Sequence, residues 1–131
     1  MKLLDRPEVN AWWALAQSDL RVAGVVAALE PPELHLACFL SQQAGEKAFK
    51  AVLEAHDRPV PRTHSLMVLR AAVGDVGVDV SHLAEPAAIL TDYGVGPRYP
   101  LLGQATRAED AAEALDAARV LMSWAERVLT G

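Results

Sequence analysis

The strongest constraint on the fold of this sequence is an apolar stripe with helical spacing in residues 106–131. Its members recur at alternating intervals of four and three residues: Ala111, Leu115, Ala118, Met122, Ala125 and Leu129. Side chains at this spacing lie on one face of an α-helix, so the segment predicts a long amphipathic helix of roughly 23 residues, about 35 Å in length. Thr106 and Glu109 have the spacing of a capping box, which predicts that the helix starts at Thr106.

Two earlier segments have the same helical period. The first begins near Pro7, a residue type suited to the first turn of a helix, and must end before Pro31 and Pro32. The second runs from about Glu33 to His56. The apolar stripe of the first is Trp13, Ala16, Leu20, Ala23 and Ala27, and that of the second is Leu34, Ala37, Ser41, Ala44, Ala48, Val52 and Ala55. Small side chains allow helices to approach closely, so both segments predict tightly packed helices.

Two shorter helices complete the predicted fold. One follows Thr63, an N-cap residue type, and ends near Val73, and the other spans residues 81 to about 92 and bends or starts near Pro86. Residues 94–104 are predicted to be irregular because they contain two prolines and three glycines. With 131 residues, 52% of them hydrophobic, the chain should form a single domain over residues 1–131. The predicted fold is all-α, an antiparallel up-and-down bundle of three long and two short helices.

Charge and composition exclude several classes of function. The net charge is −5 and the pI is near 5.3, so the basic patch of a dedicated duplex-binding domain is missing. No run of 18 uncharged apolar residues occurs, and the first ten residues carry charges where a signal peptide is apolar, which predicts a soluble cytoplasmic protein without a membrane segment. Cys38 is the only cysteine and the four histidines lack zinc-ligand spacing, so we expect no internal disulfide and no metal site.

A block of amide and charged side chains lies within the second predicted long helix. It reads Gln42-Gln43-x-x-Glu46-Lys47-x-x-Lys50. Gln43, Glu46, Lys47 and Lys50 lie at i, i+3, i+4 and i+7, so they share one face, which we expect to point away from the small-residue stripe. Two interpretations stay open. Either Glu46 and Lys50 form an i,i+4 pair of about 0.2–0.5 kcal/mol on a solvated surface, or Lys47 and Lys50 contact a phosphate or a partner.

Three motifs in this order suggest a family: the block of residues 42–50, the helix start Thr63-His64-x-Leu66, and Arg98-Tyr99-Pro100. With them, nearly the whole chain resembles the HEPN domains (higher eukaryotes and prokaryotes nucleotide-binding). The resemblance implies an α-helical up-and-down bundle that is usually dimeric. It also implies a neighbour, because HEPN domains are often encoded beside a small nucleotidyltransferase with which they form a complex.

Beside this resemblance, three side chains are candidates for contact with a nucleotide. The guanidinium of Arg98 can form bidentate bonds to phosphate, and Tyr99 can stack on a base. His64 is expected in the first turn of its helix, where unpaired N–H groups suit an anion. The alternatives are structural: Arg98 pairs with a carboxylate such as Asp92, Tyr99 packs beneath the loop, and His64 caps or packs.

The ribonuclease motif of HEPN toxins is not found at its expected place. That motif is Arg, four to six residues, then His, because the histidine exchanges a proton while the arginine stabilises the charged phosphorane. After Arg98 the corresponding positions hold Gly103, Gln104 and Ala105, and none of these can titrate. Arg58 and His64 have the required spacing but lie in the connection after the second long helix. The sequence therefore does not argue for self-contained catalysis, and whether the chain is an enzyme stays open.

The leading functional prediction is a binding module with no catalytic residues. It would be a dimeric HEPN bundle that binds a nucleotide such as ATP or the phosphates of RNA, needs no other cofactor, and serves as partner of a small nucleotidyltransferase in a toxin–antitoxin-like pair. The predicted ligand-binding residues are Gln43, Glu46, Lys47, Lys50, His64, Arg98 and Tyr99. One alternative is a divergent metal-independent endoribonuclease that uses His64 with Arg62 or Arg98. Another is a structural dimeric scaffold.

Overall fold

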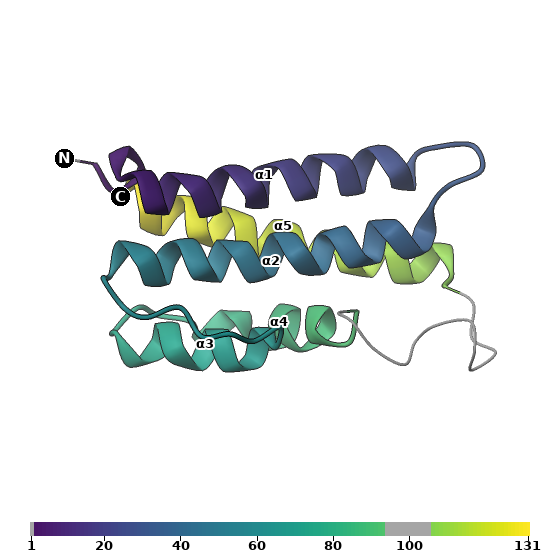
Figure 1. Cartoon of the computed structure of the whole chain (residues 1–131). Helices are drawn as coiled ribbons and strands as arrows, with labels where there is room; N and C mark the ends of the chain where they lie inside the picture. Colours follow the sequence, from purple (N-terminus) through teal and green to yellow (C-terminus); the bar gives the residue numbers. More distant parts are fainter. Residues whose placement is uncertain (1, 94–105) are drawn as a thin grey trace.

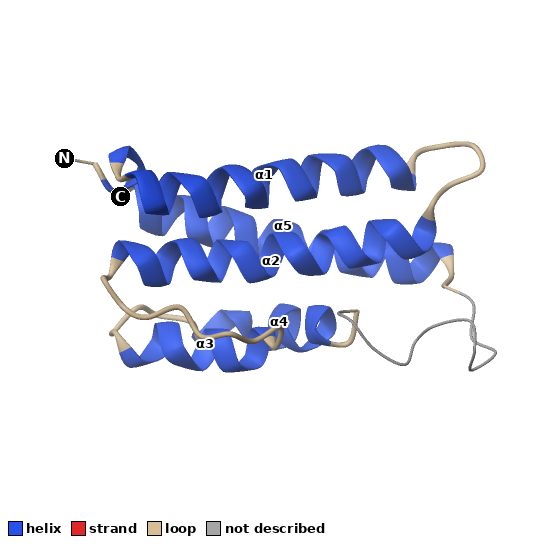
Figure 2. Ribbon diagram, in the orientation of Figure 1, coloured by secondary structure: helices blue, strands red, loops and turns tan. Residues whose placement is uncertain are grey.

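The computed structural model of the chain describes residues 2–93 and 106–131, and all regular structure in these two stretches is helical (Figure 2). The long helices are α1 (Pro7–Ala27), α2 (Leu34–Ala55) and α5 (Ala108–Thr130), and the short ones are α3 (Leu66–Asp75) and α4 (Ala84–Thr91). Turns of 3-10 helix, η1 (Leu3–Asp5) and η2 (Ser81–Leu83), precede α1 and α4. Figure 1 shows α2 antiparallel to α1, α4 antiparallel to α3 and α5 antiparallel to α4, whereas α3 runs in the same direction as α2 because the chain between them returns along α2. The predicted all-α bundle of three long and two short helices is confirmed.

The core lies around α2, which contacts each of the other four helices that the structure describes. Figure 1 shows α1 on one side of α2, α3 and α4 on the other, and α5 crossing behind α2. The whole predicted stripe of α5 is buried, and so is that of α2 except for Leu34. Phe49 of α2 packs against Trp124 of α5, with ring centroids 5.3 Å apart. The helical period of the sequence therefore identified the faces that meet in the core.

Gly45 marks the point at which the bundle is tightest. A Cβ atom at this position would lie 2.8 Å from Leu66 Cδ2, 2.9 Å from Leu121 Cδ1 and 3.0 Å from Leu90 Cδ1. Those three leucines belong to α3, α5 and α4, so three helices press against α2 where it has no side chain. Any larger residue here would have to displace them.

Two predicted helix starts are wrong by one or two residues. The N-cap of α5 is Arg107 and not Thr106, and the carboxylate of Asp110, not Glu109, accepts a hydrogen bond from the Arg107 backbone N–H at 2.9 Å. The N-cap of α3 is Ser65 and not Thr63, because the Ser65 hydroxyl accepts from the Val68 N–H at 3.3 Å. In both cases polar residues occupy neighbouring positions that could begin the helix, so sequence alone did not choose between them.

The chain between α2 and α3 returns along α2. Asp57 has a positive φ of 55°, which reverses the direction of the chain just after the end of α2. Arg6 holds this reversal in place, since its guanidinium donates to the Ala55 carbonyl at 3.2 Å and to the Asp57 carboxylate at 2.7 Å. Figure 1 shows the following residues running back beside α2 before α3 begins. This path brings residue 64 opposite the middle of α2.

The end of α4 is fastened to α5 by a tyrosine. The hydroxyl of Tyr93 donates to Glu113 at 3.1 Å and lies 3.4 Å from Asp110. Burial, followed by the bond to Glu113 and the two nearby carboxylates, raises the pKa of Tyr93 well above its ordinary value. The hydroxyl therefore stays protonated and keeps donating across the pH range in which proteins are usually studied.

Candidate functional site

The middle of α2 carries a buried carboxylate with two basic partners. Glu46 is 4% exposed and Lys50, one turn later, is 8% exposed. The Lys50 Nζ atom donates to Glu46 Oε2 at 3.0 Å, and His64 Nδ1 lies 2.9 Å from Glu46 Oε1. A charge this deeply buried is tolerated only when it is paired, and here each carboxylate oxygen has its own partner. We call Gln42, Glu46, Lys50 and His64 the polar cluster.

Gln42 connects this pair to the backbone of the returning chain. Its side chain is fully buried, and its Nε2 atom donates to the His64 carbonyl at 2.9 Å and more weakly to Glu46 Oε1 at 3.5 Å. Its Oε1 atom accepts from Gln43 Nε2 at 2.7 Å. In the described part of the chain no buried side-chain nitrogen or oxygen lacks a hydrogen-bond partner. Each buried polar atom of the cluster thus has at least one partner, and the cluster fixes the chain before α3 against α2.

His64 is the outward-facing member of the polar cluster. Its side chain is 67% exposed, although its Nδ1 atom is bonded to the buried Glu46. An ionised carboxylate can only accept, so Nδ1 must carry a proton, and the neutral ring then presents Nε2 as an acceptor. When the ring is protonated, Nε2 becomes a donor. The cluster therefore holds an imidazole in a fixed direction at the surface.

The structure corrects the predicted exposure of the block in α2. Glu46 and Lys50 are buried, so neither a solvated i,i+4 pair nor a shared exposed face describes them, although the ion pair itself is present. Lys50 Nζ also lies 5.4 Å from the centroid of the Trp12 ring, a cation–π contact. Lys47 is paired with Asp19 of α1, with both side chains less than one-fifth exposed. The solvated surface considered for this face was wrong because the returning chain and α1 cover it.

The expected position of His64 was also wrong. It precedes the N-cap Ser65 and lies outside the first turn of α3, so the N–H groups of that turn do not define its surroundings. The remaining candidates, Arg98 and Tyr99, lie outside the described residues, and so does the pairing of Arg98 with Asp92, so their roles stay predictions. In the described part of the chain no three His, Cys, Asp or Glu side chains gather as metal ligands, and no helix is both long and apolar enough to cross a bilayer.

Sequence reasoning missed Gln42, Asp19 and Trp12 as members or supports of the site. The spacing of Gln42, Glu46 and Lys50 at i, i+4 and i+8 could have revealed the first, since such residues stack along one side of a helix. No local pattern pointed to Asp19 or Trp12, because they contact the site from another helix. Exposed Arg62 lies two residues before His64 and adds positive charge to the same connection.

Comparisons with known proteins agree with this fold. A family model described as HEPN domain matches residues 9–128. The crystal structure of TT1696 from Thermus thermophilus is 31% identical to this chain, covers 95% of it and 100% of its own length, and has a TM-score of 0.80. The crystal structure of ST0689, an archaeal HEPN homologue, is 24% identical, covers 93% of this chain and 98% of its own, and has a TM-score of 0.70, a likeness of fold. The comparison with curated proteins gives no match.

Proposed function

Because this chain belongs to the HEPN domain family, we propose that it is a module that binds the phosphate groups of a nucleotide or of RNA. The observation that supports this most is the exposed His64 imidazole held by the buried Glu46 at 2.9 Å. A hydrogen-bonding group that is already fixed in direction loses little conformational entropy when it binds a ligand. Phosphate oxygens are acceptors, so the protonated ring is the form that would bind them best.

Some of the other proposed ligand-binding residues would contact the ligand directly, and the rest would position those that do. Glu46 neutralises Lys50, and Asp19 neutralises Lys47, so these two lysines shape the site more than they add charge to it. Exposed positive charge beside the polar cluster comes instead from Arg62. Arg98 and Tyr99 are proposed as contacts on the strength of the family resemblance, and Gln43 as a support that bonds to Gln42. The proposed ligand is a nucleotide such as ATP, without any other cofactor.

We also propose that the protein acts as a dimer and as partner of a small nucleotidyltransferase in a toxin–antitoxin-like pair. Large apolar side chains on α1 are 38–56% exposed, which is typical of a helix that packs against another chain. They are Leu15, Val22 and Val25. Their spacings of seven and three residues place them on one face of α1. This face supports an association but does not identify the partner.

Calorimetric titration tests the binding proposal. ATP, AMP, GTP and a short RNA would be titrated into the wild type, His64→Ala, Arg98→Ala and the matched control Arg58→Ala. Arg58 lies in the same connection as His64 and is exposed. Its side chain forms no hydrogen bond or ion pair with the four described residues of the polar cluster. We expect saturable binding that is lost in His64→Ala and Arg98→Ala and is unchanged in Arg58→Ala. Equal binding by the wild type and His64→Ala, or no binding at all, would rule out the proposed site.

The geometry of His64 favours one second candidate, a metal-independent endoribonuclease. A carboxylate bonded to Nδ1 leaves Nε2 as a general base, which could take the proton of a ribose 2′-hydroxyl as its oxygen attacks the phosphorus. The 5′-oxygen would leave with a proton from water, and Arg62 or Arg98 would stabilise the phosphorane. Cleavage of single-stranded RNA in the presence of a chelator, lost in His64→Ala, is the expected result. Intact RNA at high protein excess would exclude this candidate. If the titrations also detect no bound nucleotide or RNA, the structural dimeric scaffold would remain.

A further inference from the structure

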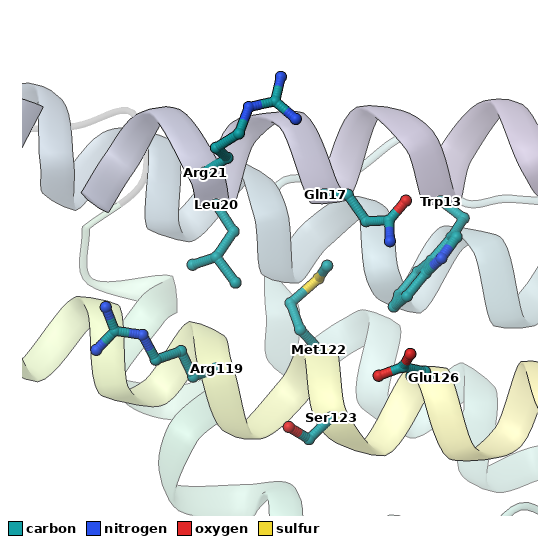
Figure 3. Close-up of a pocket in the computed structure, with 8 residues that line it drawn as sticks. All are labelled: Trp13, Gln17, Leu20, Arg21, Arg119, Met122, Ser123 and Glu126. Atoms are coloured by element: carbon teal, nitrogen blue, oxygen red, sulfur yellow. The ribbon is translucent and has the colours of Figure 1, made fainter. Parts of the chain in front are cut away.

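A groove runs between α1 and α5, and none of the residues that line it belongs to the polar cluster (Figure 3). Its volume is about 340 Å³, within the size range of sites for small molecules. Trp13 and Met122 are both nearly buried and form its floor together with the half-buried Leu20. We call this the α1–α5 groove. Because this apolar surface is open to solvent, it suits a ligand with a flat apolar part.

The charges at the rim of the α1–α5 groove are unevenly placed. Arg21 of α1 and Arg119 of α5 line one end of it, and Glu126 lines the other; Figure 3 shows the Arg21 guanidinium turned away from α5. Arg119 has one contact of 3.4 Å with Asp116, and both side chains are largely exposed. Arg21 has no ion pair with any residue that the structure describes. The exposed Arg119 side chain is therefore available at one end of an apolar groove, and the exposed Arg21 side chain can reach this end by rotation about its side-chain bonds.

We propose that the α1–α5 groove is a binding site for a small aromatic anion. The aromatic body would lie on Trp13 and Met122, and its carboxylate, sulfonate or phosphate would bind the Arg119 guanidinium, with Arg21 turning toward it from α1. An anion is favoured over a neutral molecule because it accepts the forked N–H donors of arginine. A cation is disfavoured at the arginine end for the same reason. This site is separate from His64 and goes beyond the proposed function.

Fluorescence titration with 8-anilinonaphthalene-1-sulfonate tests the proposal, since this probe carries aromatic rings and one anionic group. We expect a saturable signal with one site per folded chain. The neutral parent compound, N-phenyl-1-naphthylamine, has the same rings without the sulfonate and should bind at least tenfold more weakly. The double variant Arg21→Ala/Arg119→Ala should weaken binding of the sulfonate at least tenfold and should leave binding of the neutral compound unchanged.

Two further variants test whether the probe binds in the groove itself. Arg58→Ala/Arg107→Ala removes two exposed arginines outside the groove and should not change the affinity. Ser123→Trp places a large side chain on the exposed rim and should abolish binding while the thermal midpoint stays near that of the wild type. Equal affinity of the wild type and the Arg21/Arg119 variant, or binding that survives Ser123→Trp, would overturn the proposal. A second copy of the chain in the groove would also overturn the proposal. It would be recognised by an affinity for the probe that falls as the protein concentration rises, together with a dimeric mass by sedimentation.

Discussion

The polar cluster and the α1–α5 groove use charged side chains in opposite ways. In the cluster, Glu46 and Lys50 are 4% and 8% exposed and lie 3.0 Å apart. At the groove, the side chains of Arg119 and Asp116 are 59% and 78% exposed and lie 3.4 Å apart. Removing one partner of a buried pair leaves an uncompensated charge, whereas an exposed charge is simply hydrated. Charges in the cluster therefore hold the fold together, and those at the groove remain available for a ligand.

The largest effect should follow from removal of the buried carboxylate. Glu46→Ala leaves the Lys50 ammonium buried without its anion, and we expect the free energy of unfolding to fall by about 3–5 kcal/mol. Urea denaturation measures this. Glu54→Ala, on the same helix but without an ion pair to any described residue, is the control and should change stability by about 0.5 kcal/mol or less. A loss below about 1 kcal/mol in Glu46→Ala would remove the contrast between the two regions.

A double variant sharpens the same point. Glu46→Leu/Lys50→Met removes both buried charges and replaces them with apolar side chains of similar size. Since an apolar replacement of a buried ion pair is often neutral or stabilising, most of the loss seen in Glu46→Ala should be recovered. If the double variant is as unstable as Glu46→Ala, then packing around Glu46, rather than its charge, is what stabilises this region.

A smaller loss is expected when the buried amide is replaced. Gln42→Leu keeps the approximate volume but leaves the His64 carbonyl and the Gln43 amide without their bonds, so unfolding should become easier by about 1–3 kcal/mol. Guanidinium denaturation would measure the difference. The matched control is Gln17→Leu on the exposed rim of the α1–α5 groove, where we expect a change within about 0.5 kcal/mol. Equal effects of the two substitutions would mean that burial does not distinguish the regions.

His64→Ala should destabilise the protein by only about 1 kcal/mol. The ring is 67% exposed, and Glu46 keeps Lys50 and Gln42 as partners when it is removed. Thermal and urea unfolding of the variant would provide the value. A loss as large as that of Glu46→Ala would show that His64 belongs structurally to the buried part of the cluster, which would weaken its proposed role as a contact to phosphate.

The smallest effect on stability should come from the groove. Arg119→Ala breaks only the exposed contact with Asp116, so unfolding should change by about 0.5 kcal/mol or less. The same variant should bind 8-anilinonaphthalene-1-sulfonate several-fold more weakly, which would separate binding from stability at one residue. Differential scanning calorimetry checks the first expectation. A loss of more than about 1 kcal/mol would indicate that Arg119 supports the fold.

The helices were predictable because their signals are local. The long helices begin and end within a few residues of the predicted bounds, since apolar period, prolines and capping residues all act over a few neighbouring positions. The same locality explains the errors at Thr106 and Thr63. Neighbouring polar residues offer the backbone similar hydrogen bonds, and the choice between them depends on how the preceding chain arrives.

The sequence by itself determined the helices and the apolar faces with which they pack, because both follow from side chains only a few positions apart. Only the tertiary structure decided that Glu46 and Lys50 are buried, that Lys47 is paired with Asp19, and which atoms His64 offers to solvent. Glu46 and His64 are separated by 18 positions in the chain, and Lys47 and Asp19 by 28. Whether a polar face of a helix is solvated depends on what returns to cover it, and the period of that helix carries no information about the return.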